Sequence, residues 1–364
     1  MNYPVLYQWR EEIATRLPSL NSWQVDNVAL FSLGIIRAES SQQEQIARQM
    51  VCGEQVASAT RRLRRFGSNQ ALSLAAFFGE WTRWVMEALE TEQVYLLVDE
   101  TKLHDRLGVM VVGVAYEGRC IPLAWQCYRA NAAAAYPAEG QVGMIEHLLK
   151  QVQAGMPANK RVVVMADRGI GTSPELCRRI AALGWEYLLR VTCQSKICTE
   201  TGEYTIAQMV TPGEVWSAEG RVFKQRGQVP AQARAIWTKG YDEPWALVTN
   251  ATDLTGHEYA LRNWQEQSFR DLKSAGWQWE TSRLRNPDHM ARFMLLLVVA
   301  YGWILALGSY AAHWGRTRSL HLRPGQAPRR QWSLFKEGLQ LFVEYVQRHG
   351  VCLKFCFAPD KRLC

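Results

Sequence analysis

The sequence predicts an α/β protein that begins with a helical region. Long stretches with apolar residues at helical spacing fill the chain up to about residue 90. From Val94 the pattern changes to short continuous apolar runs, such as VYLLVDE, which are typical of fully buried strands. Short runs punctuated by glycine and proline then predict a strand-rich stretch. The predicted regions are an all-helical N-terminal domain (1–90), an α/β core in two pieces (91–192 and 251–312), a β-rich insertion (193–250) and a basic helical tail (313–364).

Length and charge narrow the class of protein. The 364 residues are enough for two or three domains. Lys and Arg number 42 against 34 Asp and Glu, and this formal charge of +8 favours a polyanionic partner. The nine cysteines show neither disulfide-framework spacing nor a CxxC pair, and the N-terminus lacks the apolar stretch of a secretion signal. We therefore expect reduced thiols and a cytoplasmic location.

The helical region contains a possible DNA-binding unit. Two short helices are predicted around a break at Gly53, and the second ends in a run of arginines. That arrangement resembles a helix-turn-helix, in which cations contact phosphates. Small helical bundles that do not touch DNA show the same pattern, so both interpretations stay open here. The arginines are Arg61, Arg62, Arg64 and Arg65.

The core elements follow one another in a recognisable order. After VYLLVDE, the runs GVMVVGVAYEG and RCIPLAWQCYR predict a hairpin around a Glu-Gly turn. A helix follows, then the strand RVVVMADRG, a helix capped by Ser173 with Pro174 at its first position, and the strand EYLLRVT. Three strands followed by helix–strand units is the element order of an RNase H-like fold.

Two segments after the insertion carry further expectations. From Phe293 to Ala312 no charged residue occurs, so the run could span a membrane or form a buried helix. We favour the buried helix, because the run follows closely on a charged amphipathic helix and no other segment is as apolar. The tail beyond it contains a second arginine cluster that could neutralise phosphates: Arg316, Arg318, Arg323, Arg329 and Arg330.

The candidate active site combines two strands and one helix. Asp99 and Asp167 follow apolar strands, and the strand ends of such sheets converge at one edge. Glu266 shares one predicted helix face with Tyr259, Arg262 and Lys273. Three carboxylates can hold two Mg²⁺ ions for phosphodiester chemistry, while the arginine, lysine and tyrosine contact phosphate oxygens.

These residues resemble the IS4-type DDE transposases of bacterial insertion sequences. The resemblance covers about Val94 to Ala312 and rests on Y-x2-R-x3-E-x6-K from Tyr259 to Lys273, on Asp99 with Thr101, and on Asp167-Arg168-Gly169. It implies cut-and-paste transposition through hairpin ends, with Mg²⁺ (or Mn²⁺ in its place) at Asp99, Asp167 and Glu266. Its implied DNA partners are the terminal inverted repeats of the transposon and the target, both double-stranded. Its implied protein partner is a second copy of the chain in a synaptic homodimer, and no membrane partner is implied.

The resemblance also implies a tryptophan that replaces a base flipped out of the transposon end. Trp245, in EPWALVTN, matches that position best, and Trp237 is the reserve candidate. Arg168 joins the expected DNA contacts through the Asp-Arg-Gly motif. Two other functions remain open from the sequence: an RNase H-like nuclease or junction resolvase that cuts without joining, and a catalytically silent DNA-binding derivative.

Overall fold

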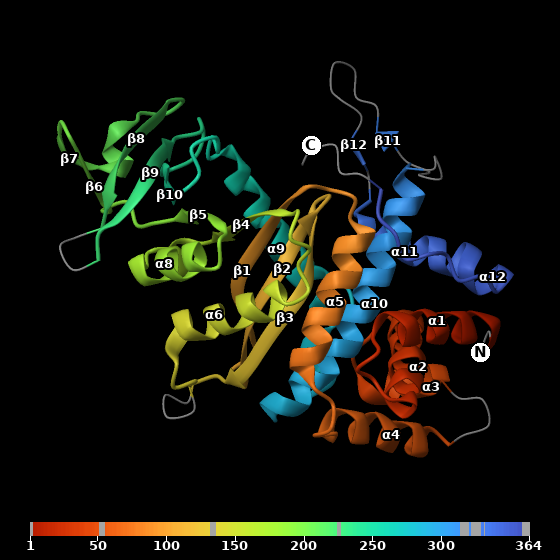
Figure 1. The fold of residues 1–364 in the computed structure, drawn as a ribbon. Coiled ribbons are helices and arrows are strands. Elements are labelled where there is room, and N and C mark those ends of the chain that lie inside the picture. The colour runs from red at the N-terminus through yellow and green to blue at the C-terminus, as the bar shows by residue number, and fades with distance from the viewer. Residues whose placement is uncertain are drawn as a thin grey trace.

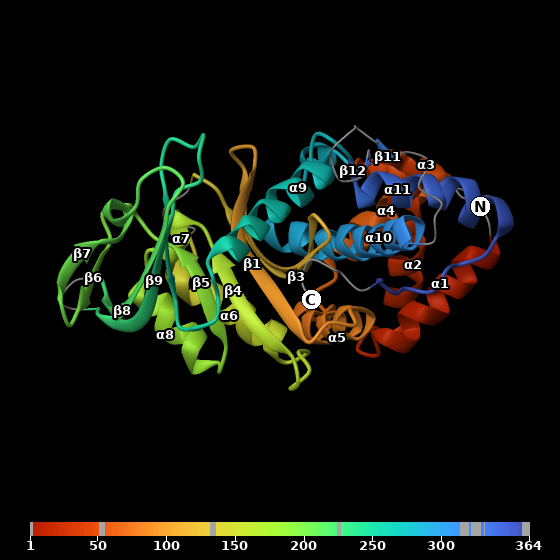
Figure 2. The same ribbon diagram turned by 90° about the horizontal axis from the view of Figure 1, so that it is seen from above.

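A computed structural model describes seven stretches of the chain: residues 3–50, 55–131, 136–223, 227–313, 320–321, 329–330 and 332–358. Helices gather in one half of the molecule and a twisted sheet fills the other (Figure 1). Seen from above, the two halves lie end to end and give an elongated shape (Figure 2).

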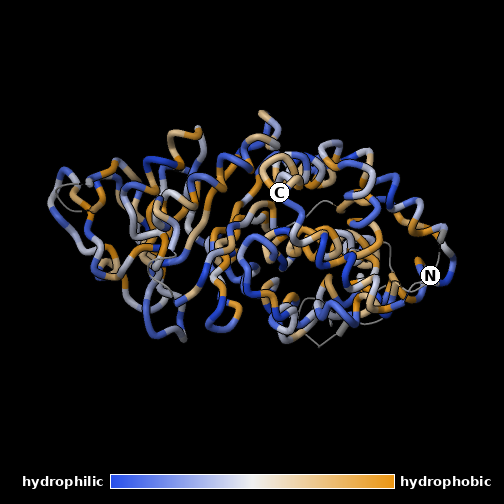
Figure 3. The backbone as a smooth tube through the Cα atoms, turned by 90° about the horizontal axis from the view of Figure 1, so that it is seen from below, coloured by the Kyte–Doolittle hydropathy of each residue, from blue (hydrophilic) through white to orange (hydrophobic). Residues whose placement is uncertain are grey.

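Five helices precede the sheet in the part of the chain that the structure describes, and two of them begin at polar caps. Asn21 and Gln24 form a reciprocal capping box at the start of the second helix, and Ser73 caps the fifth. In Figure 3, hydrophilic and hydrophobic residues are interspersed along the coiled part of the chain near the N-terminus. The five are α1 (Tyr3–Arg16), α2 (Ser22–Ala38), α3 (Gln43–Met50), α4 (Val56–Ser68) and α5 (Leu74–Ala88).

The apolar run after the insertion is a buried helix. It lies in α10 (Pro287–His313), and 94% of its most apolar 18-residue window is buried inside the protein. Trp303 of α10 stacks on Trp9 with ring centroids 4.2 Å apart. By length and composition alone, α10 could cross a membrane. Because α10 is mostly buried inside the protein, it is weak evidence for a membrane span. The expectation of a core helix is therefore confirmed.

The C-terminal segment packs onto α10 through glycine contacts. It forms α11 (Leu334–Leu341), a π-helical turn at Phe342–Val346 and α12 (Gln347–His349). A Cβ added to Gly338 would lie only 1.9 Å from the Ile304 carbonyl oxygen, so the two helix backbones touch there. Further on, Phe355 packs against Trp81 and Trp84 of α5. The C-terminal segment thus completes the core beneath the N-terminal helices.

Most of the predicted arginine cluster in the tail cannot be assigned a place. Arg316, Arg318 and Arg323 lie outside the described residues. Two short strands, β11 (Leu320–His321) and β12 (Arg329–Arg330), are described for their backbone alone. The phosphate-binding role of this cluster stays a prediction.

Five strands form the first part of the sheet, in the order β3-β2-β1-β4-β5. β1 runs parallel to β4 and β4 parallel to β5, whereas β2 is antiparallel to both β1 and β3. The β2–β3 turn has positive φ at Glu117 and Gly118, as a tight hairpin requires. The strands are β1 (Gln93–Leu103), β2 (Leu107–Tyr116), β3 (Arg119–Arg129), β4 (Arg161–Ala166) and β5 (Glu186–Arg190).

Helices cover both faces of these strands. α6 (Gly140–Gln153) and α8 (Pro174–Ala182) lie on one face and α9 (Asn263–Leu272) on the other (Figures 1 and 2). The central strands are consequently buried on both sides, which explains their continuous apolar sequence.

The strands of the predicted insertion prolong the same sheet. β10 pairs antiparallel with β5, and the order continues β5-β10-β9-β8-β6-β7. The short runs at Val215 and Arg221 belong to one strand, and a further strand begins at Lys196. The strands are β6 (Lys196–Thr199), β7 (Gly202–Thr205), β8 (Val215–Val222), β9 (Val229–Ile236) and β10 (Trp245–Thr249).

Candidate active site

Asp99 and Asp167 are neighbours because of the register between β1 and β4. Val98 lies opposite Ala166 in this parallel pair, so the next residue on each strand is one of the two aspartates. Tyr95 and Leu97 alternate with residues of the opposite face and pack in the cluster beneath α9. Asp99 continues that alternation and therefore faces α9.

The two aspartates have different backbone settings. β1 does not end at Asp99, because its pairing with β2 continues to Leu103. β4 does end before Asp167, which caps the short helix α7 (Arg168–Gly171) by accepting the Ile170 N–H at 3.1 Å. The expectation of two strand-terminal aspartates is thus met by Asp167 alone. The Asp99 side chain is 12% exposed, whereas the Asp167 side chain is 40% exposed.

The predicted single helix from Tyr259 to Lys273 is wrong. Tyr259 and Arg262 lie in a 3₁₀ segment (His257–Arg262) that begins after Gly256, whose φ is +95°. The α-helical turn starts only at Asn263, and Lys273 caps its C-terminus. Because a 3₁₀ helix has three residues per turn, Tyr259 and Arg262 still lie on one side. The motif converges through a 3₁₀-to-α junction rather than along one helix face.

The Arg262 guanidinium connects all three carboxylates. Its Nη2 lies 3.0 Å from Asp99 Oδ2 and 3.5 Å from Asp167 Oδ2, and its Nη1 pairs with Glu266. The arginine side chain is 12% exposed, so these contacts are poorly screened by solvent. Two strands and a helix, far apart in sequence, therefore bring three carboxylates around one cation.

Burial changes the acidity of this cluster. It raises the pKa of Asp99 from 3.8 to about 6, although the charge of Arg262 and the Glu100 N–H oppose the rise. Burial likewise raises the pKa of the Tyr259 phenol to about 12. Tyr259 is therefore neutral at physiological pH and can act as a hydrogen-bond donor.

Lys273 points to the other side of the site. Its Nζ donates to the Lys102 carbonyl at 2.6 Å and lies 3.8 Å from Glu280. Burial lowers the pKa of Lys273. This lysine fixes the end of α9 to β1 instead of lining the pocket beside the carboxylates.

A pocket of about 520 Å³ opens beside Asp167 and Glu266. Trp245 and Tyr259 line it with their rings edge to face, 5.1 Å apart at 74°. Trp237 is absent from its lining and donates its indole N–H to the Tyr241 carbonyl. The geometry therefore favours Trp245 over the reserve candidate.

Sequence reasoning missed two residues beside this pocket. Arg190 lines it, and Glu243 pairs with both Arg190 and Arg168. Arg190 is the last residue of β5, so the strand-end argument used for the aspartates would have found it. The Nε groups of Arg190 and Arg262 are buried without a hydrogen-bond partner in the described part of the chain. Each of these N–H groups is therefore a donor whose hydrogen bond is not made among the described residues.

The N-terminal arginines lie on α4, in the helical half of the molecule. Arg62 donates to Asn27 at 2.7 Å, which ties α4 to α2. Arg61, Arg64 and Arg65 are exposed. The two short helices of the predicted unit are present, with Gly53 outside the described residues, and their DNA-binding role stays a prediction.

The donor chemistry of the three carboxylates suits a hard divalent cation. Within the described ranges no three His, Cys, Asp or Glu side chains already stand in a metal-binding cluster. The carboxylates are instead arranged around a guanidinium, which is itself a cation. They fit the charge and ligand type of a magnesium site, with Arg262 in the space between them.

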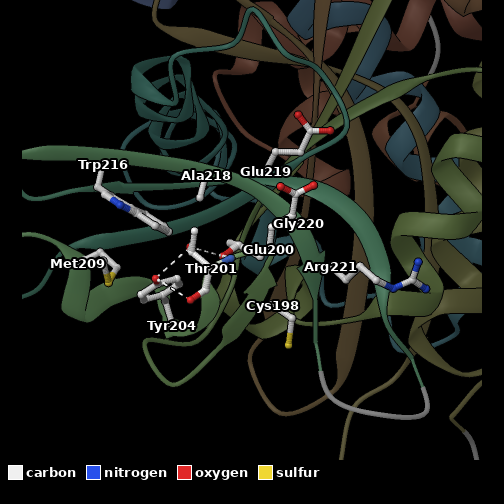
Figure 4. Close-up of a pocket in the computed structure, with 11 residues that line it drawn as sticks. Cys198, Glu200, Thr201, Tyr204, Met209, Trp216, Ala218, Glu219, Gly220 and Arg221 are labelled. Atoms are coloured by element: carbon white, nitrogen blue, oxygen red, sulfur yellow. Dashed lines mark hydrogen bonds between the residues drawn. The ribbon is translucent and has the colours of Figure 1, made fainter.

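A larger pocket shares no lining residue with the pocket beside the carboxylates. It measures about 1010 Å³ and is formed by the insertion strands. Figure 4 shows Trp216 and Tyr204 reaching into it from two strands, with the Tyr204 hydroxyl bonded to Thr201. Its charged lining residues are Glu200, Glu219 and Arg221, so it lacks the carboxylate cluster. Size alone does not identify the reactive site here.

Comparison with known protein families agrees with the geometry. Residues 138–303 match the model of the transposase DDE domain. The matched segment contains Asp167 and Glu266 but begins after Asp99. Among curated proteins, none matches this chain. The match supports a DDE transposase family over that segment.

Proposed function

We propose that this protein is an IS4-type transposase that excises and inserts an insertion sequence by cutting and pasting, with Asp99, Asp167 and Glu266 as its catalytic carboxylates. One observation carries the proposal: side chains from β1, from the residue that follows β4 and from α9 meet at the Arg262 guanidinium beside an open pocket. In this proposal β1–β5 and α9 form an RNase H-like core, and the strands from β6 to β10 form its insertion.

The carboxylates would hold two Mg²⁺ ions, which Mn²⁺ could replace. Such ions supply an activated oxygen nucleophile and neutralise charge on the phosphoryl oxygens. The protein's part is to hold three oxygen donors at one edge of a rigid sheet. Burial raises the pKa of Asp99 to about 6, so a proton would compete with the metal ion for this carboxylate at lower pH.

The cations beside the carboxylates would position the DNA strand. Arg262 and Arg190 each keep a buried Nε donor without a partner among the described residues, and a phosphate oxygen would satisfy them. Arg168, at the pocket rim, would exchange Glu243 for a phosphate. Tyr259 would donate its hydroxyl to the same strand. Lys273, now bound to the Lys102 carbonyl, would contribute after that bond opens.

Trp245 would receive a base flipped from the transposon end. It is partly exposed in the pocket beside Asp167, and stacking on tryptophan stabilises an unstacked base by about 1–3 kcal/mol. The flipped base would accompany formation of a DNA hairpin at each end. The remaining partners in this proposal are terminal inverted repeats, target DNA and a second copy of the chain in a cytoplasmic synaptic dimer.

The test separates joining from cutting. A duplex that carries the DNA flanking the reading frame is incubated with the protein, Mg²⁺ and a supercoiled plasmid. Transposition predicts hairpin-ended fragments and plasmid joined to the labelled 3′ ends, both abolished by EDTA. Cutting without joining would support a nuclease or junction resolvase instead. Binding without cutting would identify a catalytically silent derivative.

A further inference from the structure

A groove lies where the N-terminal helices meet the segment between α9 and α10. It measures about 560 Å³. Arg64 and Arg65 of α4 line one side, and Arg283 and His289 line the other. These two sides are more than 200 residues apart in the sequence, so only the folded chain brings their cations together.

The positive charge of the groove is largely uncompensated. Glu44 is the acidic residue in the lining, and it is paired with Arg48 at 2.6 Å. Arg65 and Arg283 are exposed and form no ion pair with any residue that the structure describes. Arg64 bonds to a neutral partner, the Gln43 amide oxygen. Exposed cations without counter-charges create a site for an anion.

The segment that presents Arg283 is held rigidly. Gln278 and Arg283 both have positive φ, 52° and 57°, which non-glycine residues rarely adopt. Ser41 fixes this segment by donating its N–H to the Trp277 carbonyl and its hydroxyl to the Gln278 carbonyl, both at 2.7 Å. The fully buried Trp279 anchors it from below. Unfavourable backbone conformations held in this way cluster at functional sites.

The same segment reaches the catalytic strand on its other side. The Glu280 carbonyl accepts a hydrogen bond from Arg106 at 3.1 Å, and its carboxylate lies 3.8 Å from Lys273 Nζ. Lys273 in turn bonds to Lys102, three residues after Asp99 on β1. A short chain of contacts therefore links the groove to the carboxylate site.

We propose that this groove binds the phosphate backbone of the duplex whose end lies at Asp99. Arg64 and Arg65 from the N-terminal helices and Arg283 from the catalytic half hold one and the same duplex. The cations come from two separate segments that line one open groove, which suits a row of phosphates. This proposal rests on the function proposed above and adds the surface that aligns the DNA.

The experiment measures duplex affinity by fluorescence anisotropy over a salt series, using the full chain and the duplex that flanks the reading frame. Arg283→Ala and Arg65→Ala should each weaken binding about tenfold. Each should also reduce the slope of log K against log salt by about 0.9 per lost phosphate contact. Arg283→Lys should restore the slope, since a lysine keeps the charge. Arg348→Ala, which removes an exposed arginine of α12 outside the groove, is the matched control.

Two outcomes would overturn the proposal. One is an Arg283→Ala protein that matches Arg348→Ala in affinity and salt slope. The other is displacement of the duplex by inorganic phosphate at constant ionic strength, which would indicate a site for single anions. Either result leaves the proposed function standing if the wild-type protein still cuts and joins DNA. Conversely, Arg283→Ala could lose duplex binding while the wild-type protein shows no cleavage. That result would support duplex binding in the groove and refute the proposed transposase activity.

Discussion

Arg262 governs the electrostatics of the site, because its guanidinium contacts three carboxylates at once. Replacing it with alanine removes the cation that now balances them. Arg262→Ala should therefore bind Mn²⁺ about tenfold more tightly, equal to about 1.4 kcal/mol, while its metal-free form loses stability. Isothermal titration of Mn²⁺ checks the affinity, with Arg262→Lys as the charge-preserving control. Equal Mn²⁺ affinity in all three proteins would show that Arg262 and metal do not compete.

The raised pKa of Asp99 predicts how the free energy of unfolding depends on pH. Its folded pKa of about 6 exceeds the ordinary 3.8, mainly because of burial. The stability that it contributes is fully present below the unfolded pKa and is lost as pH rises through about 6. As the pH rises from 3.8 to about 6, the free energy of unfolding of the wild type should fall by roughly 2–3 kcal/mol relative to that of Asp99→Asn. Urea unfolding at several pH values measures the difference, and parallel profiles for the two proteins would refute it.

Substitutions at Trp245 can distinguish a role in hairpin formation from a role in packing. If it receives a flipped base, Trp245→Ala should slow hairpin formation about tenfold or more, from about 1–3 kcal/mol of lost stacking. Nicking and end binding should change little, and Trp245→Phe should recover part of the rate. Measuring all three steps and the melting temperature on one preparation decides the matter. If Trp245→Ala weakens end binding, nicking and hairpin formation equally and lowers the melting temperature, Trp245 is a packing residue.

At the scale of elements, α9 is held in place by a buried ion pair. Asp271 pairs with Arg119 at 2.5 Å and accepts the Tyr301 hydroxyl at 3.1 Å. Asp271→Ala would leave the largely buried Arg119 without its carboxylate, which costs about 3–5 kcal/mol. Denaturant unfolding measures this loss. Asp26→Ala, which breaks an exposed pair with Arg10, should cost less than about 1 kcal/mol. Similar values for the two variants would contradict a positioning role for Asp271.

The elements that sequence predicted well are those with an unambiguous period. β1, β4 and β5 are buried on both faces, so continuous apolar runs mark them. The helix from Tyr259 to Lys273 was mispredicted, because i, i+3 spacing fits both a 3₁₀ and an α-helical turn. Lys273 could not be placed from spacing, since its contact with Lys102 depends on where α9 meets β1.

Across the whole molecule, long-range pairing decides what the sequence leaves open. Nothing local in EYLLRVT or WALVT indicates that β5 and β10 pair, yet that pairing joins the insertion strands to the sheet. Nor does the tail sequence indicate that Phe355 completes the core beneath α5. The sequence predicts the three candidate carboxylates by residue type and spacing. Their arrangement around Arg262 required the fold.

The central claim is that Asp99, Asp167 and Glu266 act together in metal-dependent DNA cleavage. The most direct measurement is the rate of end cleavage by Asp99→Ala, Asp167→Ala and Glu266→Ala, each beside its affinity for the same duplex. Glu243→Ala, which removes a carboxylate at Arg168 and Arg190 outside the trio, is the matched control. Each of the three variants should lose cleavage while binding stays largely intact, and Glu243→Ala should still cleave. A normal cleavage rate in any one of the three would contradict the central claim.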